Sequence, residues 1–155
     1  MPAPGDATEI LIVRTAENPD LPVPEAATEG SVGLDLRACV PQPVVLQPGR
    51  RRLIPTGFRV ALPEGFEGQI RPRSGLALRQ GLTLLNSPGT IDADYRGEIA
   101  VIAINLGEEP VTISRGDRIA QLVVAPVARP RLRLVDEDLP PSRRAAGGFG
   151  HTGTS

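Results

Sequence analysis

Glycine and proline interrupt this sequence so often that its apolar stretches stay short. The 155 residues include 17 glycines and 17 prolines, and the runs between them are rich in valine, isoleucine and leucine. Runs of this kind, bounded by turn-forming residues, are typical of β-strands. No long segment carries the 3.6-residue apolar period of an amphipathic helix. The sequence therefore predicts an all-β fold, built as a sandwich, a jelly roll or a barrel.

Seven apolar runs are the main strand candidates, and they cover residues 9–16, 33–40, 51–62, 66–74, 97–106, 111–114 and 118–128. The alternating segment 131–135 could add another strand. Only residues 74–81 have room for a helical turn, with Ser74 as its N-cap. A charged patch and then a glycine-rich stretch fill residues 136–155. We therefore expect one β domain over residues 1–135 and a flexible glycine-rich C-terminal arm over residues 136–155.

The bulk composition argues against membrane and nucleic-acid partners. Apolar residues make up 40% of the chain, and the formal net charge is −1. No 18-residue apolar run is present, and the first residues lack the basic-then-apolar plan of a signal peptide. Cys39 is the sole cysteine, so no intrachain disulfide can form, and we expect its thiol to be buried. These features predict a cytoplasmic protein that binds neither membranes nor nucleic acid.

Two of the four aromatic residues fall outside the predicted strands. Phe58 and Phe66 lie in or beside apolar runs, as core residues do, whereas Tyr95 lies in GTIDADYRG and Phe149 in the C-terminal stretch RRAAGGFGHTGTS. A flat, partly polar ligand such as a nucleobase would suit two rings outside the core.

The segment GTIDADYRGEI (89–99) carries two carboxylates and a tyrosine between glycines. In an extended entry to a hairpin, alternation would send Asp92 and Asp94 to one side and Tyr95 to the other. A carboxylate there could orient or deprotonate a water molecule. Alternatively, the segment is an ordinary Asx turn that joins two strands.

Three further segments could contribute side chains to a site. In RPRSGLAL, a strand runs into a helical turn whose N–H groups could bind phosphate together with Arg73 and Ser74, or Ser74 could simply cap the turn. In GSVGLDLRA, Asp35 either faces solvent or is held for function. In GDRIAQLVV, Gln121 interrupts an apolar run, so its amide either bonds to backbone or faces a cleft.

The sequence offers little for a metal held by the protein alone. It has one histidine, one cysteine and no spaced cluster of ligands, so we expect no tight transition-metal site. A Ser-His-Asp triad would have to use His151, which lies in the arm, and we disfavour it. Mg²⁺ carried in on a phosphate ligand remains compatible, because Mg²⁺ commonly keeps waters and binds substrate oxygens.

Five segments, taken in order, resemble the five ordered motifs of the trimeric dUTPase family. They are GSVGLDLRA, RPRSGLAL, GTIDADYRGEI, GDRIAQLVV and RRAAGGFGHTG, and together they run from about residue 30 to 153. The resemblance implies a jelly-roll-like β fold and a homotrimer whose active sites are shared between subunits. It also implies hydrolysis of dUTP to dUMP and pyrophosphate with Mg²⁺. This reaction keeps uracil out of DNA and supplies dUMP for thymidylate synthesis.

The resemblance gives roles to residues around the base and the sugar. Asp92 aligns with the carboxylate that positions and activates the attacking water in line with the α-phosphorus. Tyr95 aligns with the ring that packs under the deoxyribose and leaves no room for a 2′-hydroxyl. Asn86 matches a polar position near the uracil and the water. Backbone groups around Gly89, Thr90 and Ile91 would bind the edge of the uracil. The tight hairpin that carries them would clash with the 5-methyl group of thymine.

The resemblance also implies how the triphosphate is bound. The triphosphate-binding segment is matched by Arg73, Ser74 and Gly75. Asp35 and Gln121 match positions that contact the metal–phosphate system through water, although the Asp35 carboxylate could instead brace the neighbouring loop.

In the family the glycine-rich tail is a lid that comes from a third subunit. Phe149 would stack on the uracil and Arg144 would reach the γ-phosphate. Gly147, Gly148 and Gly150 would let the backbone approach the phosphates. His151 stands where the family often has serine or histidine. One residue departs from the pattern: Ala145 replaces the usual glycine, so closure is strained if this position needs a positive φ.

Two alternative functions remain open from the sequence. A dCTP deaminase, or a bifunctional deaminase and dUTPase of related fold, would carry Ser-Ser and Ala-Arg where this chain has RPRSGLA. A non-catalytic β-trimer would bind nucleotide without turnover, but such a scaffold has no need of a complete water-activating set.

Overall fold

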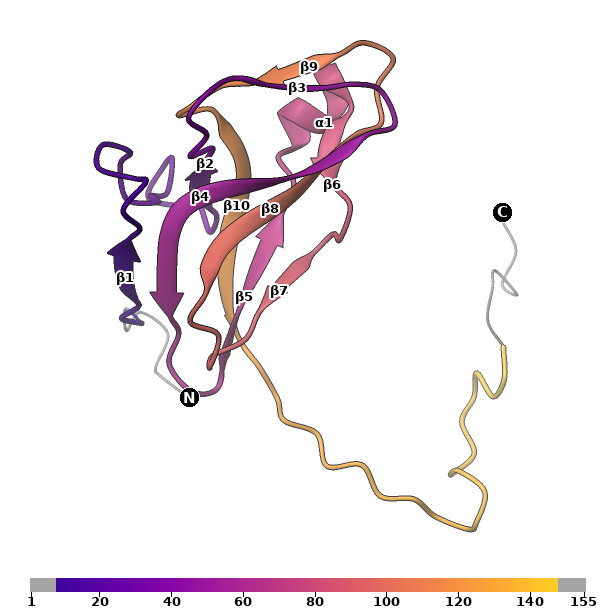
Figure 1. Cartoon of the computed structure of the whole chain (residues 1–155). Coiled ribbons are helices and arrows are strands. Elements are labelled where there is room, and N and C mark those ends of the chain that lie inside the picture. The colour runs from indigo at the N-terminus through magenta and orange to yellow at the C-terminus, as the bar shows by residue number, and fades with distance from the viewer. Residues whose placement is uncertain (1–7, 148–155) are drawn as a thin grey trace.

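The computed structural model describes residues 8–147. Within them the elements are β1 (Leu11–Arg14), β2 (Leu34–Arg37), β3 (Val44–Leu46), β4 (Arg51–Ala61), β5 (Phe66–Arg71), α1 (Ser74–Gln80), β6 (Leu82–Leu84), β7 (Gly89–Ile91), β8 (Glu98–Asn105), β9 (Val111–Ile113) and β10 (Arg118–Pro126). The strands pair antiparallel throughout this part of the chain. The predicted all-β, jelly-roll-like class is therefore confirmed (Figure 1).

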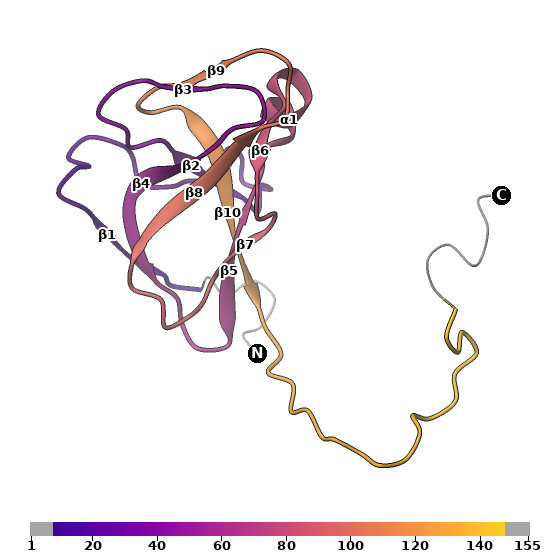
Figure 2. The same cartoon turned by 45° about the vertical axis from the view of Figure 1, so that its right-hand side comes forward.

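Two four-stranded sheets enclose the core. The first has the order β1-β4-β8-β6 and the second has the order β2-β10-β5-β7, while β3 and β9 form a small third sheet (Figures 1 and 2). Ile54 and Val101 of the first sheet belong to the same buried cluster as Leu36, Ile70 and Leu122 of the second. The period-2 alternation of each strand sends one apolar face inward, and burial of these faces against each other holds the sheets together.

The seven main strand candidates all form strands, and each strand is shorter than its apolar run. Segment 131–135 does not form a strand, and Leu132 and Leu134 are 92% and 95% exposed. The helical turn is present, but Arg73 rather than Ser74 occupies the N-cap and makes no side-chain capping bond. Phe58 is buried as expected, whereas Phe66 is only half-buried.

The segment between β7 and β8 crosses from one sheet to the other. β7 pairs with β5 in the second sheet, and β8 pairs with β4 and β6 in the first. The two strands therefore do not form the expected hairpin. Residues 92–97 turn instead of extending, because the chain has to change sheets there.

The chain leaves the β domain after β10. Residues 127–147 form no helix or strand, and the ribbon runs away from the sheets in both views (Figures 1 and 2). A bond from the Val127 N–H to the Gly65 carbonyl, 2.8 Å long, ties the start of this segment to the domain. Among the described residues, no helix is long and apolar enough to cross a membrane.

Candidate functional site

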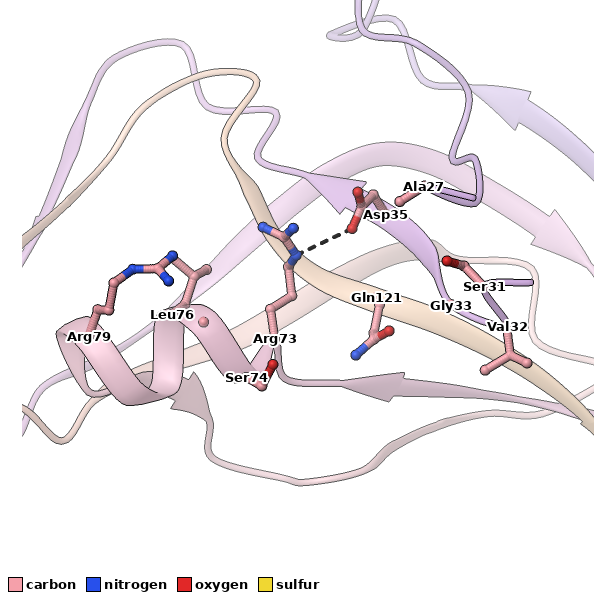
Figure 3. A pocket seen from close by; sticks show the side chains of 11 residues that line it. Ala27, Ser31, Val32, Gly33, Asp35, Arg73, Ser74, Leu76, Arg79 and Gln121 are labelled. Carbon is pink, nitrogen blue, oxygen red and sulfur yellow. Dashed lines mark ion pairs between the residues drawn. The ribbon is translucent and has the colours of Figure 1, made fainter. Parts of the chain in front are cut away.

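A pocket of about 340 Å³ lies where β2, β10 and the start of α1 meet. We call it the β2–β10 pocket (Figure 3). Its lining brings together three of the sequence motifs and consists of Ala27, Ser31, Val32, Gly33, Asp35, Arg73, Ser74, Gly75, Leu76, Arg79 and Gln121. Every residue predicted from the sequence to contact the triphosphate outside the arm therefore lines one pocket.

Asp35 organises the charges in the β2–β10 pocket. Its Oδ1 lies 3.3 Å from Nε of Arg73 and its Oδ2 lies 3.1 Å from Nη1 of Arg118. The carboxylate side chain is only 15% exposed. Arg73 also donates from Nη1 to the Arg118 carbonyl at 3.1 Å. The guanidinium of Arg73 is thus held from two sides, and its remaining N–H groups can point at an anion.

Gln121 lies beside Asp35, with which it pairs across β2 and β10. Its Nε2 donates to the Pro72 carbonyl at 2.9 Å, so both expectations for this amide hold: it bonds to backbone and it lines a cleft. A Cβ added to Gly33 would lie 2.0 Å from Oε1 of Gln121. A side chain at position 33 would therefore displace the Gln121 amide from its place in the pocket.

A second pocket, of about 490 Å³, lies between β7, the 92–97 turn and β8. We call it the β7–β8 pocket. Its lining consists of Leu53, Asn86, Thr90, Ile91, Asp92, Tyr95, Glu98, Ala100 and Ile102. Asp92 and Tyr95 thus face the same pocket, and the expectation that they point to opposite sides was wrong. Strand alternation does not apply to this pair, because the segment turns: the Tyr95 N–H donates to the Asp92 carbonyl at 3.1 Å.

The turn that carries Asp92 and Tyr95 is fixed by short local bonds. The Tyr95 hydroxyl donates to the Glu98 carbonyl at 3.0 Å. Arg96 donates from Nη1 to the carbonyls of Ala93 and Tyr95, at 2.7 and 2.8 Å. Such bonds lower the freedom of the turn and so preserve the relative placement of its carboxylate and its ring.

The residues predicted to surround the uracil also lie together. Asn86 and Gly89 share the lining of a smaller cavity of about 70 Å³ with Thr90 and Ile91. The amide Nδ2 of Asn86 would be 3.1 Å from a Cβ on Gly89. A side chain at position 89 would therefore crowd Asn86.

The described part of the arm ends in a turn. Arg144 donates from Nε to the Gly147 carbonyl at 2.7 Å. Ala145 has a φ of 47°, which lies in the left-handed region that favours glycine. The condition for strain at Ala145 therefore holds in this turn, and its effect on closure stays a prediction. Phe149, Gly150 and His151, together with Gly148, lie outside the described residues.

Over residues 8–147, no group of three or more histidine, cysteine, aspartate or glutamate side chains is arranged to hold a metal ion. Both oxygens of Asp35 face arginines. With both oxygens engaged by arginines, Asp35 is not free to bind a metal directly, and it could contact a cation only through water.

Sequence reasoning missed two arginines: Arg79, which lines the β2–β10 pocket, and Arg118, which pairs with the Asp35 carboxylate of that pocket. Arg118 belongs to the GDRIAQLVV motif, but its ion pair with Asp35 becomes visible only once β2 and β10 are paired. Arg79 follows Gly75 by one helical turn, and its Nη2 would be 3.0 Å from a Cβ at position 75. The i, i+4 spacing of Gly75 and Arg79 in the predicted helical turn could have indicated that the Arg79 side chain lies close to the Gly75 backbone.

The two pockets have no lining residue in common. The first includes residues of β2 and the second includes residues of β7, and these strands are the opposite edges of the β2-β10-β5-β7 sheet. Adjacent strands are about 4.8 Å apart, so the two edges are separated by roughly 14 Å. One chain therefore gathers the candidate residues into two separate half-sites.

An antiparallel jelly-roll with an arginine-lined pocket at one sheet edge, and a carboxylate and a tyrosine in a pocket at the other, defines a nucleotide-binding β protein equipped for hydrolysis. Comparisons with known proteins identify the family of this chain. The dUTPase family model matches residues 20–153. The chain therefore belongs to the dUTPase family.

Known relatives agree with this assignment. The chain is 60% identical to the deoxyuridine 5′-triphosphate nucleotidohydrolase of Caulobacter vibrioides over 147 residues, which cover 93% of this chain and 94% of that protein. It is 56% identical to the enzyme of the same name from a Thermoanaerobacter species, covering 93% and 97%. Among solved structures, the dUTPase of Staphylococcus bacteriophage 80alpha with dUpNHpp superposes with a TM-score of 0.85 at 26% identity, covering 95% and 99%.

Proposed function

We propose a residue-level mechanism for the dUTP hydrolysis that this chain carries out as a dUTP diphosphatase. One observation carries it: Asp92 and Tyr95 line the same pocket and are tied together by the bond from the Tyr95 N–H to the Asp92 carbonyl. The relatives named as dUTP nucleotidohydrolases and the phage enzyme with dUpNHpp support the substrate.

In this proposal the β7–β8 pocket takes the uracil and the deoxyribose. Backbone around Gly89, Thr90 and Ile91 binds the polar edge of the base, with Asn86 beside it. The Tyr95 ring packs against the sugar and excludes a ribose. A buried hydrogen-bonding edge gives strong selection, because a base with the wrong donors leaves protein groups unpaired.

Asp92 acts as the base for the attacking water. The carboxylate takes a proton as the water oxygen forms a bond to the α-phosphorus. The bond from that phosphorus to the α–β bridging oxygen breaks, and pyrophosphate leaves on the opposite side. Holding the water in line removes much of the entropic barrier to attack.

The β2–β10 pocket takes the phosphates. Arg73 supplies charge-assisted hydrogen bonds, and the backbone at Ser74 and Gly75 supplies N–H donors. Asp35 holds Arg73 in place through their ion pair. Mg²⁺ bound to the triphosphate would neutralise charge on the leaving group, and Asp35 and Gln121 would contact it through water. A solved structure of the dUTPase from phage phi11 of S. aureus concerns the coordination of a structural Mg(II) ion, which shows that a related protein binds Mg²⁺.

A complete site needs both pockets, so we propose a homotrimer in which neighbouring subunits supply the two halves. The separation of the half-sites at opposite sheet edges supports this assembly. The arm, residues 136–155, would close over the site from a third subunit and bring Arg144 and the expected ligands Phe149, Gly150 and His151. Cys39 is a free, buried thiol, which is compatible with the cytoplasmic location we propose.

Mixing two inactive variants tests the shared site. Asp92→Asn and Arg73→Gln each inactivate one half-site, so in the proposed trimer some mixed sites regain two intact halves. Random subunit exchange should restore roughly a quarter of wild-type turnover. Sites contained within one chain would give no recovery after mixing, and this result would overturn the assembly.

The role of Asp92 is tested with Asp92→Asn. Pyrophosphate release from dUTP should be nearly abolished, while binding of dUTP stays close to normal. Asp94→Asn is the matched control, because Asp94 lies in the same turn but does not line the β7–β8 pocket. Near-normal turnover in Asp92→Asn would remove the assigned role. A wild-type protein that binds dUTP without turnover would instead point to the non-catalytic alternative.

A further inference from the structure

The ring of Tyr95 lies directly against the backbone of Gly97. A Cβ built on Gly97 would be 2.3 Å from the Tyr95 Oη, 2.5 Å from Cζ and 2.9 Å from Cε2. Real Cβ atoms do not approach other heavy atoms below 3.0 Å. A side chain at position 97 and the ring of Tyr95 cannot both occupy their places.

The backbone at position 97 does not itself demand glycine. The glycines with positive φ among the described residues are Gly49, Gly57, Gly65, Gly81 and Gly116. Gly97 is not one of them, so an alanine there can adopt the same backbone conformation. The space taken by the tyrosine ring is therefore what excludes a side chain at this position.

The ring cannot easily yield by sliding along the chain, because it is held at both ends. The ring hydroxyl donates to the Glu98 carbonyl at 3.0 Å, and the backbone that carries the ring is held by the bond from the Tyr95 N–H to the Asp92 carbonyl, 3.1 Å long. Glu98 is fixed in turn, since its Oε1 accepts from the Gly57 N–H at 2.7 Å. Tyr95 is 43% exposed and lines the β7–β8 pocket. A ring that is displaced by a side chain at position 97 can therefore move into that pocket.

We propose that Gly97 is a specificity-determining positioning residue for dUTP hydrolysis. Because Gly97 has no side chain, the edge of the Tyr95 ring packs against the chain at this position. Gly97 thereby sets how far the ring protrudes into the β7–β8 pocket. That distance fixes the room left for the sugar. The inference rests on the proposed packing of Tyr95 against the deoxyribose.

Gly97→Ala tests the proposal. Displacement of the ring toward the sugar should lower kcat/KM for dUTP at least tenfold, mainly through a higher KM, and should narrow the ratio of kcat/KM between dUTP and UTP. The variant keeps Asp92, and it keeps Arg73 and Arg79 of the β2–β10 pocket, so kcat should change less than KM. Unchanged KM and an unchanged dUTP/UTP ratio would overturn the proposal.

A double-mutant cycle separates this role from a general effect on folding. In a Tyr95→Ala background the ring is gone, so adding Gly97→Ala should change kcat/KM for dUTP less than twofold. Equal losses in both backgrounds would mean that Gly97 acts without Tyr95, and the proposal would fail. If Gly97→Ala alone does not fold, the proposal expects the double variant to recover the folded trimer, and failure of both would overturn it.

The single variant Tyr95→Ala distinguishes the proposed role of Tyr95 from the proposed role of Gly97. If it loses discrimination between dUTP and UTP while Gly97→Ala leaves KM and the ratio unchanged, the role of Tyr95 stands and only the inference about Gly97 falls. If Tyr95→Ala keeps full discrimination, the sugar-packing role of Tyr95 fails, and the inference that rests on it fails with it.

Discussion

Asp35 on β2 and Arg118 at the start of β10 form an ion pair in which Oδ2 of the carboxylate lies 3.1 Å from Nη1 of the guanidinium. The same carboxylate also pairs with Arg73. One partly buried negative charge thus compensates two arginines at the edge of a pocket. This arrangement keeps Arg73 oriented before any anion arrives, which lowers the ordering cost of binding.

Asp35→Asn should therefore raise the KM for dUTP at least threefold, because Arg73 loses its ionic partner and gains rotational freedom. The matched control is Asp20→Asn, which breaks the exposed ion pair with Arg115. Steady-state kinetics of pyrophosphate release measure both variants. The control should match the wild type, and an Asp35→Asn variant with wild-type KM would remove the bracing role.

The sequence predicted the fold class and the family, because both depend on local patterns. Short apolar runs between glycines and prolines are visible without a partner strand, and ordered motifs are visible without contacts. The strands β3, β6 and β7 have three residues each and were not foreseen. Strands this short exist because a neighbouring strand pairs with them, and that information is not local.

The details of the site depended on irregular backbone that alternation does not describe. A register shift between Arg118 and Ala120 changes which way Arg118 faces, so its pairing with Asp35 could not be derived from period-2 alternation. The change of sheet between β7 and β8 likewise turned Asp92 and Tyr95 toward one pocket. Both features arise from the packing of two sheets.

Ala145→Gly should relieve backbone strain in the arm. An alanine with a φ of 47° costs about 1–2 kcal/mol relative to an ordinary backbone conformation. If the closed arm always uses this turn and the open arm adopts it only part of the time, removing about 1 kcal/mol of strain lowers the KM for dUTP up to roughly fivefold, partly offset by the greater freedom of glycine when the arm is open. Ala146→Gly is the control and should give no gain. A higher KM in Ala145→Gly would mean that closure uses a different backbone conformation.

Deletion of residues 143–155 should leave the fold intact and severely reduce turnover. The last strand ends at Pro126, and residues 127–147 contribute no helix or strand, so the core does not depend on the arm. Thermal unfolding should give a midpoint within a few degrees of the wild type. Unchanged kcat in the truncated protein would refute the proposed lid.

Acidification should remove the contribution of the Asp20–Arg115 ion pair to stability. The hydrogen bond from Arg115 lowers the pKa of Asp20 below its ordinary value of 3.8. Because the pKa is lower in the folded state, the pair stabilises the protein above pH 3.8, and this contribution is lost as the pH falls through the lowered pKa. Wild type and Asp20→Asn should differ in unfolding midpoint at pH 7, and this difference should shrink as the pH is lowered below 3.8, if both remain folded in moderate salt. A difference that persists unchanged at pH 2 would show that Asp20 contributes through packing and not through its charge.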